Sequence, residues 1–393
     1  MGVRPAAMAI AALLLHGAGP AAAQPAPTPT PLVGEVPSPP RPFDGSDGHR
    51  HLVYELRLLN ATGAEAALRR LAVLDGGTGA PLLALDAAGI AGRMALGGGR
   101  GEGTANLGAH QFGVAFLHVR LDPAAPAPAS LSHEVEGAFG PPVGADARTR
   151  LAPTPVLAAP PPPVLGPPFR GGGYLAGDGC CDSTRHLRAL LPLDGAFRLS
   201  QRFAIDWERL DGEGRLVRGD LRDPRSYRIY GEPVLAGAAA TVAEARDGLP
   251  DQVPGALPAG LPIAEADGNF VVLDIGGGAH LLYAHLRPGS VRVRAGDRVR
   301  RGDPMGEVGN SGNSQAPHLH MHAMDGPSPL LADGIPYVFE SFAVTAVATG
   351  GTADFDRAEA TGSPLALAPL SPPARLRRAL PLDLSVVDWG GGP

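Results

Sequence analysis

The chain has 393 residues and a formal net charge of −6, and 44% of its residues are hydrophobic while 5% are aromatic. This length suits two ordinary domains with tails. The negative charge argues against a nucleic-acid-binding protein, which would favour a basic face. The chain has no run of eighteen apolar residues, so we expect no membrane span in the processed protein.

The N-terminus has the three parts of an export signal. Arg4 supplies positive charge, Ala6–Leu15 is a short apolar core, and Ala21–Ala23 offers a small-residue cleavage site. Because ten apolar residues are too few to span a bilayer, we expect cleavage before Gln24 and an exported protein, periplasmic or secreted. Residues 24–44 are crowded with proline and predict a disordered spacer.

Residues 45–150 predict a separate β-sandwich-like domain. Residues 51–59 alternate between apolar and polar side chains, and residues 112–119 are apolar on both faces. Short strands separated by Gly, Asp and Pro turns are typical of a small antiparallel sandwich. Its role stays open between binding the cell wall or a partner and spacing the domain that follows. We see no catalytic cluster among its histidines, which are His49, His51, His110, His118 and His133.

A proline-rich linker and two adjacent cysteines follow this domain. The linker is residues 151–169, and the cysteines are Cys180 and Cys181. Cα atoms joined by a trans peptide lie about 3.8 Å apart, below the roughly 4.4–6.8 Å usual for a disulfide. We therefore expect two buried thiols rather than a vicinal bridge or an intermolecular one. A metal cluster of the cysteines with Asp182 and His186 matches no standard zinc spacing.

The next region, residues 170–347, predicts a second antiparallel β domain, and residues 348–393 predict a C-terminal tail. Residues 247–268 predict a long loop beside a groove, since they contain several prolines and glycines. Four short apolar segments predict strands, namely residues 233–236, 241–243, 270–275 and 281–283.

Three alternating histidines mark the end of this region. In an extended strand His318, His320 and His322 share one face, as metal ligands or proton carriers must. Neutral imidazoles with a carboxylate form the usual nitrogen and oxygen ligands of catalytic zinc. The plain alternative is a surface strand that happens to carry three histidines.

Several motifs around these histidines occur together. Tyr283–Leu286 has the pattern Y-x-H-L, and Val293–Gly306 has the pattern V-x-x-G-D-x-V-x-x-G-x-x-x-G. Gly309–Ser314 is a small-residue loop that leads to H-x-H at His318–His320. Over about residues 185–345 the chain resembles the lysostaphin/LytM-type zinc endopeptidases, which cut peptide bonds in bacterial cell walls.

The resemblance implies an all-β fold, in which the sandwich-like domain precedes an antiparallel β-sheet peptidase domain of LytM/lysostaphin type. It implies zinc as cofactor, with Asp206 and His320 as metal ligands. It also implies that His285 and His318 are catalytic residues that orient the attacking water and stabilise the oxyanion, tasks that suit a side chain with a pKa near working pH.

The chain departs from the family at the first metal ligand. The family's H-x-x-x-D motif aligns with Arg202–Asp206, so Arg202 stands where a ligand histidine is expected. A guanidinium has no lone pair and repels cations, and two ligands fall short of the three that catalytic zinc normally has. His186 or His322 could supply the third ligand. Alternatively, Arg202 could pair with Asp206 where the metal would be.

Two functions follow. The first is an exported zinc metalloendopeptidase that hydrolyses the peptide cross-links of peptidoglycan. The second is a degenerate domain that binds the wall or regulates another cell-wall hydrolase. The three retained histidines and Asp206 favour the enzyme, whereas Arg202 favours the binding domain. We lean to the enzyme, with peptidoglycan peptides as its partners.

Overall fold

The computed structural model describes residues 29–97, 103–140, 143 and 147–390. The predicted export signal (residues 1–23) and the first residues of the predicted spacer (24–28) lie outside these ranges. Within them, no helix is both long enough and apolar enough to cross a membrane.

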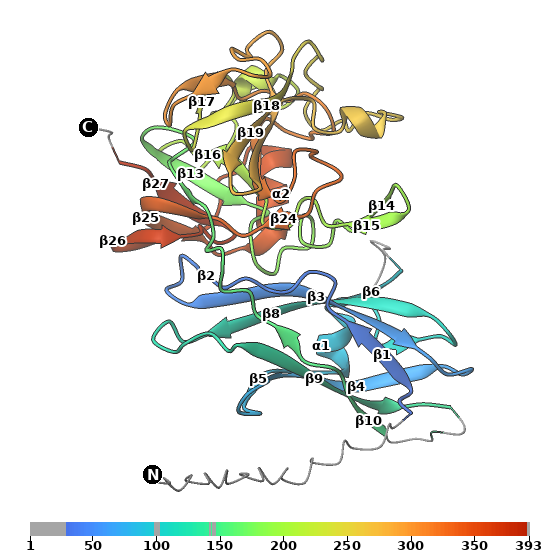
Figure 1. Ribbon diagram of the computed structural model, residues 1–393. Helices are drawn as coiled ribbons and strands as arrows, with labels where there is room; N and C mark the ends of the chain where they lie inside the picture. The colour runs from blue at the N-terminus through green and yellow to red at the C-terminus, as the bar shows by residue number, and fades with distance from the viewer. Residues whose placement is uncertain (1–28, 98–102, 141–142, 144–146, 391–393) are drawn as a thin grey trace, which may run out of the picture. The chain divides into compact units, whose positions relative to one another are not determined.

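The N-terminal region consists of two antiparallel sheets that enclose an apolar core (Figure 1). One sheet has the order β1–β3–β8–β6 with β2 beside β3, and the other has the order β10–β9–β4–β5 with β7 beside β4 and β11 beside β9. The alternation in residues 51–59 places Leu52, Tyr54, Leu56 and Leu58 in the core. The predicted sandwich is therefore confirmed. Its elements are Leu32–Glu35 (β1), Phe43–Asp44 (β2), Arg50–Asn60 (β3), Ala66–Asp75 (β4), Pro81–Asp86 (β5), Ala87–Ala91 (α1), Met94–Leu96 (β6), Asn106–Leu107 (β7), Phe112–Leu121 (β8), Ser130–Ala138 (β9), Ala147–Arg150 (β10) and Thr154–Pro155 (β11).

The second region is built on one large sheet, with the order β12–β25–β27–β13–β16–β23–β20–β19–β18–β21 and with β24 beside β23 and β26 beside β25. Its central ladders are antiparallel, as the predicted all-β fold requires. The elements are Val164–Leu165 (β12), Gly172–Gly177 (β13), Leu191–Leu193 (β14), Ala196–Arg198 (β15), Ile205–Arg209 (β16), Pro233–Leu235 (β17), Ala240–Arg246 (β18), Asn269–Gly276 (β19), Ala279–Leu286 (β20), Arg298–Val299 (β21), Pro304–Glu307 (β22), Leu319–Met324 (β23), Gly334–Ile335 (β24), Val338–Ala348 (β25), Gly351–Thr361 (α2), Leu367–Ala379 (β26) and Ser385–Asp388 (β27), with short 3₁₀ turns at Pro224–Ser226 and Ile263–Glu265.

The two proline-rich segments contain more structure than their composition predicts. Strand β1 lies in the predicted spacer and pairs with β3, and in the predicted linker β11 pairs with β9 and β12 with β25. The apolar residues between the prolines account for this, because Leu32, Leu165 and Phe169 are buried in the cores. Proline is tolerated in such strands at the edge of a sheet.

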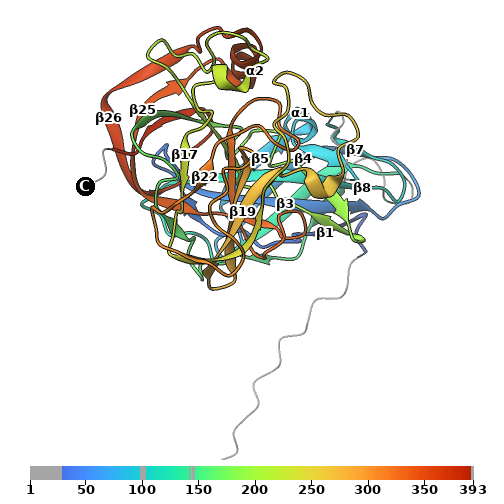
Figure 2. The same cartoon turned by 90° about the horizontal axis from the view of Figure 1, so that it is seen from above.

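The predicted C-terminal tail is wrong. Strand β27 pairs with β25 on one side and with β13 on the other, so the end of the chain completes the large sheet (Figure 1). Strand β26 lies beside β25, as Figure 2 shows. Val386 and Val387 are buried there, but a strand of four residues has no periodicity long enough to be recognised.

Asp383, which lies just before β27, also holds the loop between β13 and β14 in place. The Asp383 N–H donates to the carbonyl of Cys180 at 2.8 Å, and the Gly179 N–H donates to the Asp383 carboxyl group at 2.9 Å. Cys180 and Cys181 form a disulfide in this loop, so the expectation of free thiols is wrong. Their peptide bond is cis with Cα atoms 3.0 Å apart, whereas the expectation had assumed a trans bond.

We predict that Asp383→Asn makes the protein more stable at pH 8 and leaves it nearly unchanged at pH 4. Burial raises the pKa of Asp383 from 3.8 to about 7, so ionising this group costs stability as the pH rises through that window. Asparagine keeps an oxygen for the Gly179 N–H and cannot ionise. Urea unfolding should show a gain of about 1–2 kcal/mol at pH 8. An equal gain at both pH values would contradict the assignment.

A buried ion pair joins the two regions. The Arg202 guanidinium donates to the Glu55 carboxylate at 2.6 Å, and both side chains are at most 4% exposed. Arg202 also donates to the Gly334 carbonyl at 3.1 Å and to the Ser38 hydroxyl at 3.2 Å. Beside it, the rings of Phe43 and Phe203 meet edge to face. These contacts fix β3 against the turn that precedes β16.

Replacing Glu55 by Gln should destabilise the protein by about 3–5 kcal/mol, because the Arg202 charge stays buried without its partner. The matched control is Glu35→Gln, which removes the carboxylate of the exposed Glu35–Arg57 pair in the same sheet. That change should cost at most about 1 kcal/mol. Urea titrations measure the free energy of unfolding of the two variants. Equal losses would show that the buried Glu55–Arg202 pair contributes no more to stability than the exposed pair.

Candidate metal centre

Three neighbouring strands bring the central residues of the site together. The register of β16 and β23 places Asp206 opposite His320, and the register of β23 and β20 places His320 opposite Ala284. Cross-strand partners lie on the same face of a sheet. Alternation alone would turn His285 to the other face, but its backbone is left-handed with φ 60°. Its ring therefore lies 5.8 Å from that of His320, centroid to centroid.

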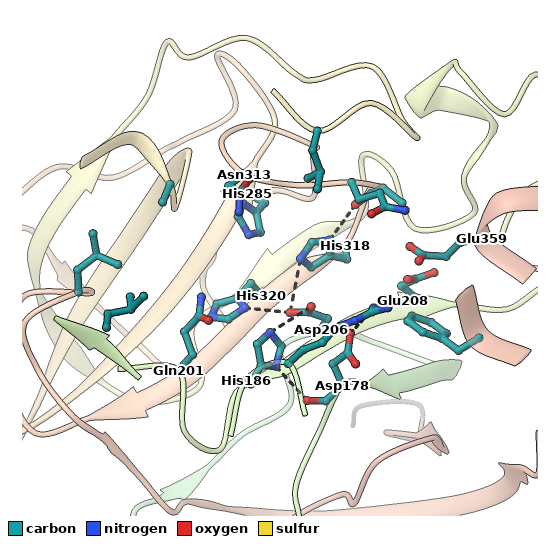
Figure 3. A pocket seen from close by; sticks show the side chains of 18 of the residues that line it. Asp178, His186, Gln201, Asp206, Glu208, His285, Asn313, His318, His320 and Glu359 are labelled. Carbon is teal, nitrogen blue, oxygen red and sulfur yellow. Dashed lines mark hydrogen bonds and ion pairs between the residues drawn. The ribbon is translucent and has the colours of Figure 1, made fainter. Parts of the chain in front are cut away.

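Asp206 is the hub of the site, and three histidines surround its carboxylate (Figure 3). His320 Nδ1 lies 2.9 Å from one oxygen, and His318 Nε2 lies 3.5 Å from the same atom. His186 Nε2 lies 3.3 Å from the other oxygen. The side chain of Asp206 is 16% exposed, and His186 and His320 are buried.

His186 comes from the loop after β13, twenty residues before Asp206. Its Nδ1 lies 2.9 Å from the backbone carbonyl of Asp178, which can only accept, so Nδ1 carries the hydrogen. The other nitrogen, Nε2, then faces Asp206 with a lone pair when the ring is neutral. The sequence offers His186 and His322 equally as a substitute ligand, and the fold places His186 at the carboxylate.

His322 lies behind His320. Its Nδ1 is 3.0 Å from His320 Nε2, whereas the opposite nitrogen of His320 faces Asp206. His322 therefore supports the His320 ring and does not reach the carboxylate. Such a contact orients a ligand histidine and fixes its tautomer.

Arg202 is absent from the site. Phe203 has a left-handed backbone with φ 66°, which interrupts the strand alternation just before β16. The guanidinium consequently points to Glu55 and Gly334, away from Asp206. The alternative that Arg202 pairs with Asp206 is wrong, because it assumed that the strand extends back to residue 202.

His285 and His318 are both held through Nδ1. His285 Nδ1 donates to the Ser311 carbonyl at 2.8 Å, and His318 Nδ1 donates to the Ala316 carbonyl at 2.7 Å. The two rings are 4.7 Å apart, and both residues line the groove. Burial and the neighbouring histidines hold the pKa of His285 well below its ordinary value, so this ring is neutral.

The ionised carboxylate of Asp206 needs a positive charge beside it. Burial would raise the pKa of Asp206, but His186 and the other histidines hold it well below its ordinary value. Burial would lower the pKa of His186, but Asp206 raises it to about 9. A proton therefore lies between these two side chains unless another cation replaces it. Ligand atoms of His186, Asp206 and His320 lie within 4.8 Å of one another, and two imidazoles with a carboxylate fit a catalytic zinc site.

A groove of about 540 Å³ opens beside the hub. The predicted long loop contributes Leu257, Ile263 and Ala266 to its lining. Part of the groove is lined by two carboxyl groups that the sequence did not predict there, and Glu208 faces Glu359 at this wall (Figure 3). Burial raises the pKa of Glu359 to about 7. Glu359 lies on α2, inside the predicted tail, and for this reason no motif connected it to the site.

Comparison with known proteins finds a matching family. Residues 227–330 match the sequence model of Peptidase family M23. This segment is similar to the M23 peptidases. It contains His285, His318 and His320 and begins after Asp206, so the resemblance inferred from the motifs is confirmed for this part of the chain. The replacement of a ligand histidine by Arg202 stays a prediction.

Solved structures were also compared with the chain, while no curated protein sequence matches it. The catalytic domain of the M23 protein EnpA from Enterococcus faecalis is 18% identical, with 44% of this chain and 92% of that chain covered and a TM-score of 0.25. The catalytic domain of lysostaphin from Staphylococcus simulans is 22% identical (42% and 88% covered, TM-score 0.23). A zinc-containing peptidase from Vibrio cholerae is 13% identical (77% and 83% covered, TM-score 0.22).

Zinc binding should depend on His186 and not on position 202. We predict that His186→Ala lowers zinc affinity at least about 100-fold, since the loss of one of three ligands leaves too few. Arg202→His should leave the affinity unchanged, because that side chain points away from Asp206. Isothermal titration with zinc measures both variants. Tighter binding by Arg202→His would show instead that position 202 reaches the site.

Proposed function

We propose that the chain is an exported zinc metalloendopeptidase that hydrolyses peptide cross-links of bacterial peptidoglycan. The observation that carries this proposal is the position of His186, which places a third donor beside Asp206 and His320. The M23 domain over residues 227–330 supports a peptidase. The leader-like N-terminus supports export to the compartment where peptidoglycan lies.

The residues present suit zinc, which His186, Asp206 and His320 would hold. When bound, it would polarise the scissile carbonyl and lower the pKa of a bound water. The groove, which is lined by apolar residues of the long loop and by carboxyl groups, would accommodate an extended peptide. Burial raises the pKa of both Glu208 and Glu359, so this wall offers carboxyl groups that can donate hydrogen bonds to a substrate as well as accept them.

His285 and His318 would carry the proton chemistry. With Nδ1 bonded to a backbone carbonyl, each ring presents Nε2 to the groove. One neutral ring accepts a proton from the attacking water as the C–O bond forms and gives it to the leaving amine as the C–N bond breaks. The other ring, when protonated, donates a hydrogen bond to the developing oxyanion. The carbonyls of Ser311 and Ala316 hold the rings in the required tautomer and orientation.

The alternative, a degenerate domain without metal, depended on the missing third ligand. It gains no support from Arg202, since that residue pairs with Glu55 outside the site. A metal-free binding domain would also have no use for two histidines held by backbone carbonyls at the edge of a groove.

His285→Ala should keep zinc and lose peptidoglycan cleavage by about 10²–10⁴-fold, the range expected for a general base. The assay follows new amino termini released from purified peptidoglycan. The control is His280→Ala on the same strand, because His280 pairs with Asp274 and Met324 away from the groove. Wild-type protein that binds zinc stoichiometrically and releases no amino termini would contradict the proposed function.

A further inference from the structure

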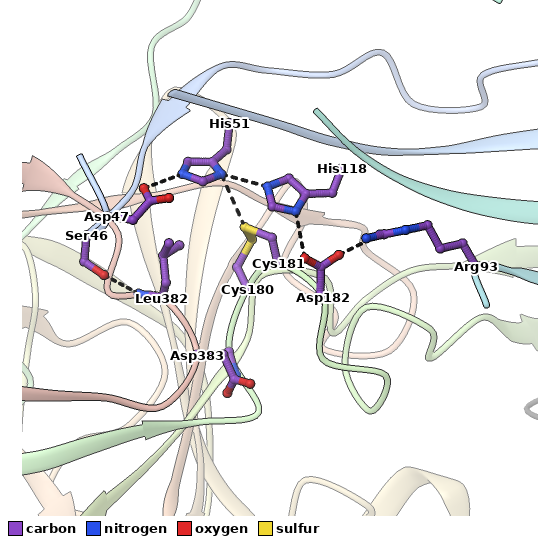
Figure 4. Close-up of a disulfide and its surroundings, with 11 residues drawn as sticks. Ser46, Asp47, His51, Arg93, His118, Cys180, Cys181, Asp182, Leu382 and Asp383 are labelled. Carbon is purple, nitrogen blue, oxygen red and sulfur yellow. Dashed lines mark hydrogen bonds and ion pairs between the residues drawn. A yellow bond between two sulfur atoms is a disulfide. The ribbon is translucent and has the colours of Figure 1, made fainter. Parts of the chain in front are cut away.

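A second histidine cluster lies on the other side of the loop that carries His186. In Figure 4, His51 of β3 and His118 of β8 face each other above the Cys180–Cys181 disulfide. His51 is 1% exposed and Cys181 is 8% exposed. From the sequence these histidines were scattered residues without a role, and the fold brings them together.

The hydrogen bonds of the two rings leave their facing nitrogens without a hydrogen. His51 Nε2 lies 2.9 Å from the Asp47 carboxylate, and His118 Nδ1 lies 3.0 Å from the Asp182 carboxylate. Ionised carboxylates only accept, so these two nitrogens are the donors. His51 Nδ1 and His118 Nε2 are 2.8 Å apart, and in neutral rings both present lone pairs. A proton or a metal ion must lie between them.

The carboxylates act as orienting groups. Burial would raise the pKa of Asp182, but His118 and Arg93 hold it below its ordinary value. Burial would also raise the pKa of Asp47, but His51 holds it below its ordinary value. The Arg120 guanidinium lies 3.0 Å from the same carboxylate. A carboxylate behind each imidazole is the arrangement that positions histidine ligands around a metal.

Cys181 supplies a third ligand atom. Its sulfur lies 4.0 Å from His51 Nδ1, and the sulfur and the two facing nitrogens lie within 4.8 Å of one another. Ligand atoms around tetrahedral zinc are about 3.3–3.6 Å apart, so shifts of roughly half an ångström would complete the set. A cavity of about 500 Å³ borders all three residues and leaves room for a water as fourth ligand. Cys180 does not belong to this set.

We propose that His51, His118 and Cys181 form a second transition-metal site, for a zinc-sized divalent ion, and that the disulfide keeps it closed. A sulfur in a disulfide is a poor ligand, whereas a thiolate is a strong one. A dithiol opens the site by giving two electrons and two protons to the bridge, so the S–S bond breaks, two cysteine thiols form and the dithiol becomes a disulfide. Cys181 then releases its thiol proton to solvent as it binds the ion. This site is independent of the proposed peptidase activity.

The two single cysteine variants test the proposal as a matched pair. Both lose the disulfide, but Cys180→Ser frees the sulfur that lies in the cluster, whereas Cys181→Ser frees the one outside it. Cobalt(II) is the probe, since its thiolate-to-metal charge-transfer absorption cannot arise from the nitrogen and oxygen donors around Asp206. Full-length Cys180→Ser should show this absorption once cobalt exceeds two equivalents, enough to fill the Asp206 site as well, without any reductant. Cys181→Ser and the oxidised wild type should not show it.

Adding His118→Ala to Cys180→Ser should weaken cobalt binding at this site at least about tenfold while circular dichroism reports the same fold. Equal absorption in the two cysteine variants would overturn the proposal, because the position of Cys181 would then not matter. So would a folded Cys180→Ser protein without the absorption. Absorption in the oxidised wild type would refute the role of the disulfide.

Discussion

The site depends on one carboxylate that lies among imidazoles. Asp206 stays ionised at 16% exposure because His186, His318 and His320 approach its two oxygens within 3.5 Å. Each of the three rings can present a lone pair there, so the arrangement is satisfied only by a positive charge at its centre. A proton on His186 provides that charge in the absence of metal. In the proposed peptidase, zinc would replace this proton and supply the positive charge.

The surrounding fold maintains this arrangement through backbone features and long-range contacts. Left-handed residues at Phe203 and His285 break the strand alternation, which sends Arg202 out of the site and brings His285 into it. The Glu55–Arg202 pair fixes the turn before β16 from the N-terminal sheet, and the Asp383 segment holds the loop that carries His186. The groove residues thus depend on parts of the chain far from the M23 segment at residues 227–330.

The sequence predicted the features that depend on residues close together in the chain. The alternation in residues 51–59 predicted β3 and its buried face, and the Y-x-H-L and H-x-H motifs located His285, His318 and His320. The alternative that Arg202 pairs with Asp206 assumed an unbroken strand, whereas the left-handed backbone of Phe203 interrupts it. His186, Glu359 and the His51–His118 pair reach their places through contacts between distant segments. No spacing within the sequence encodes such contacts.

Anomalous X-ray scattering at the zinc absorption edge, from crystals of the processed full-length protein, tests the central claim that His186 completes the metal centre. The account predicts a zinc peak about 2.0–2.2 Å from His186 Nε2, from an oxygen of Asp206 and from His320 Nδ1. His285, His318 and His320 form an overlapping set of donors within 4.8 Å. A zinc peak beside His285, His318 and His320 that is distant from His186, or no peak at Asp206, would contradict the claim that His186 completes the metal centre.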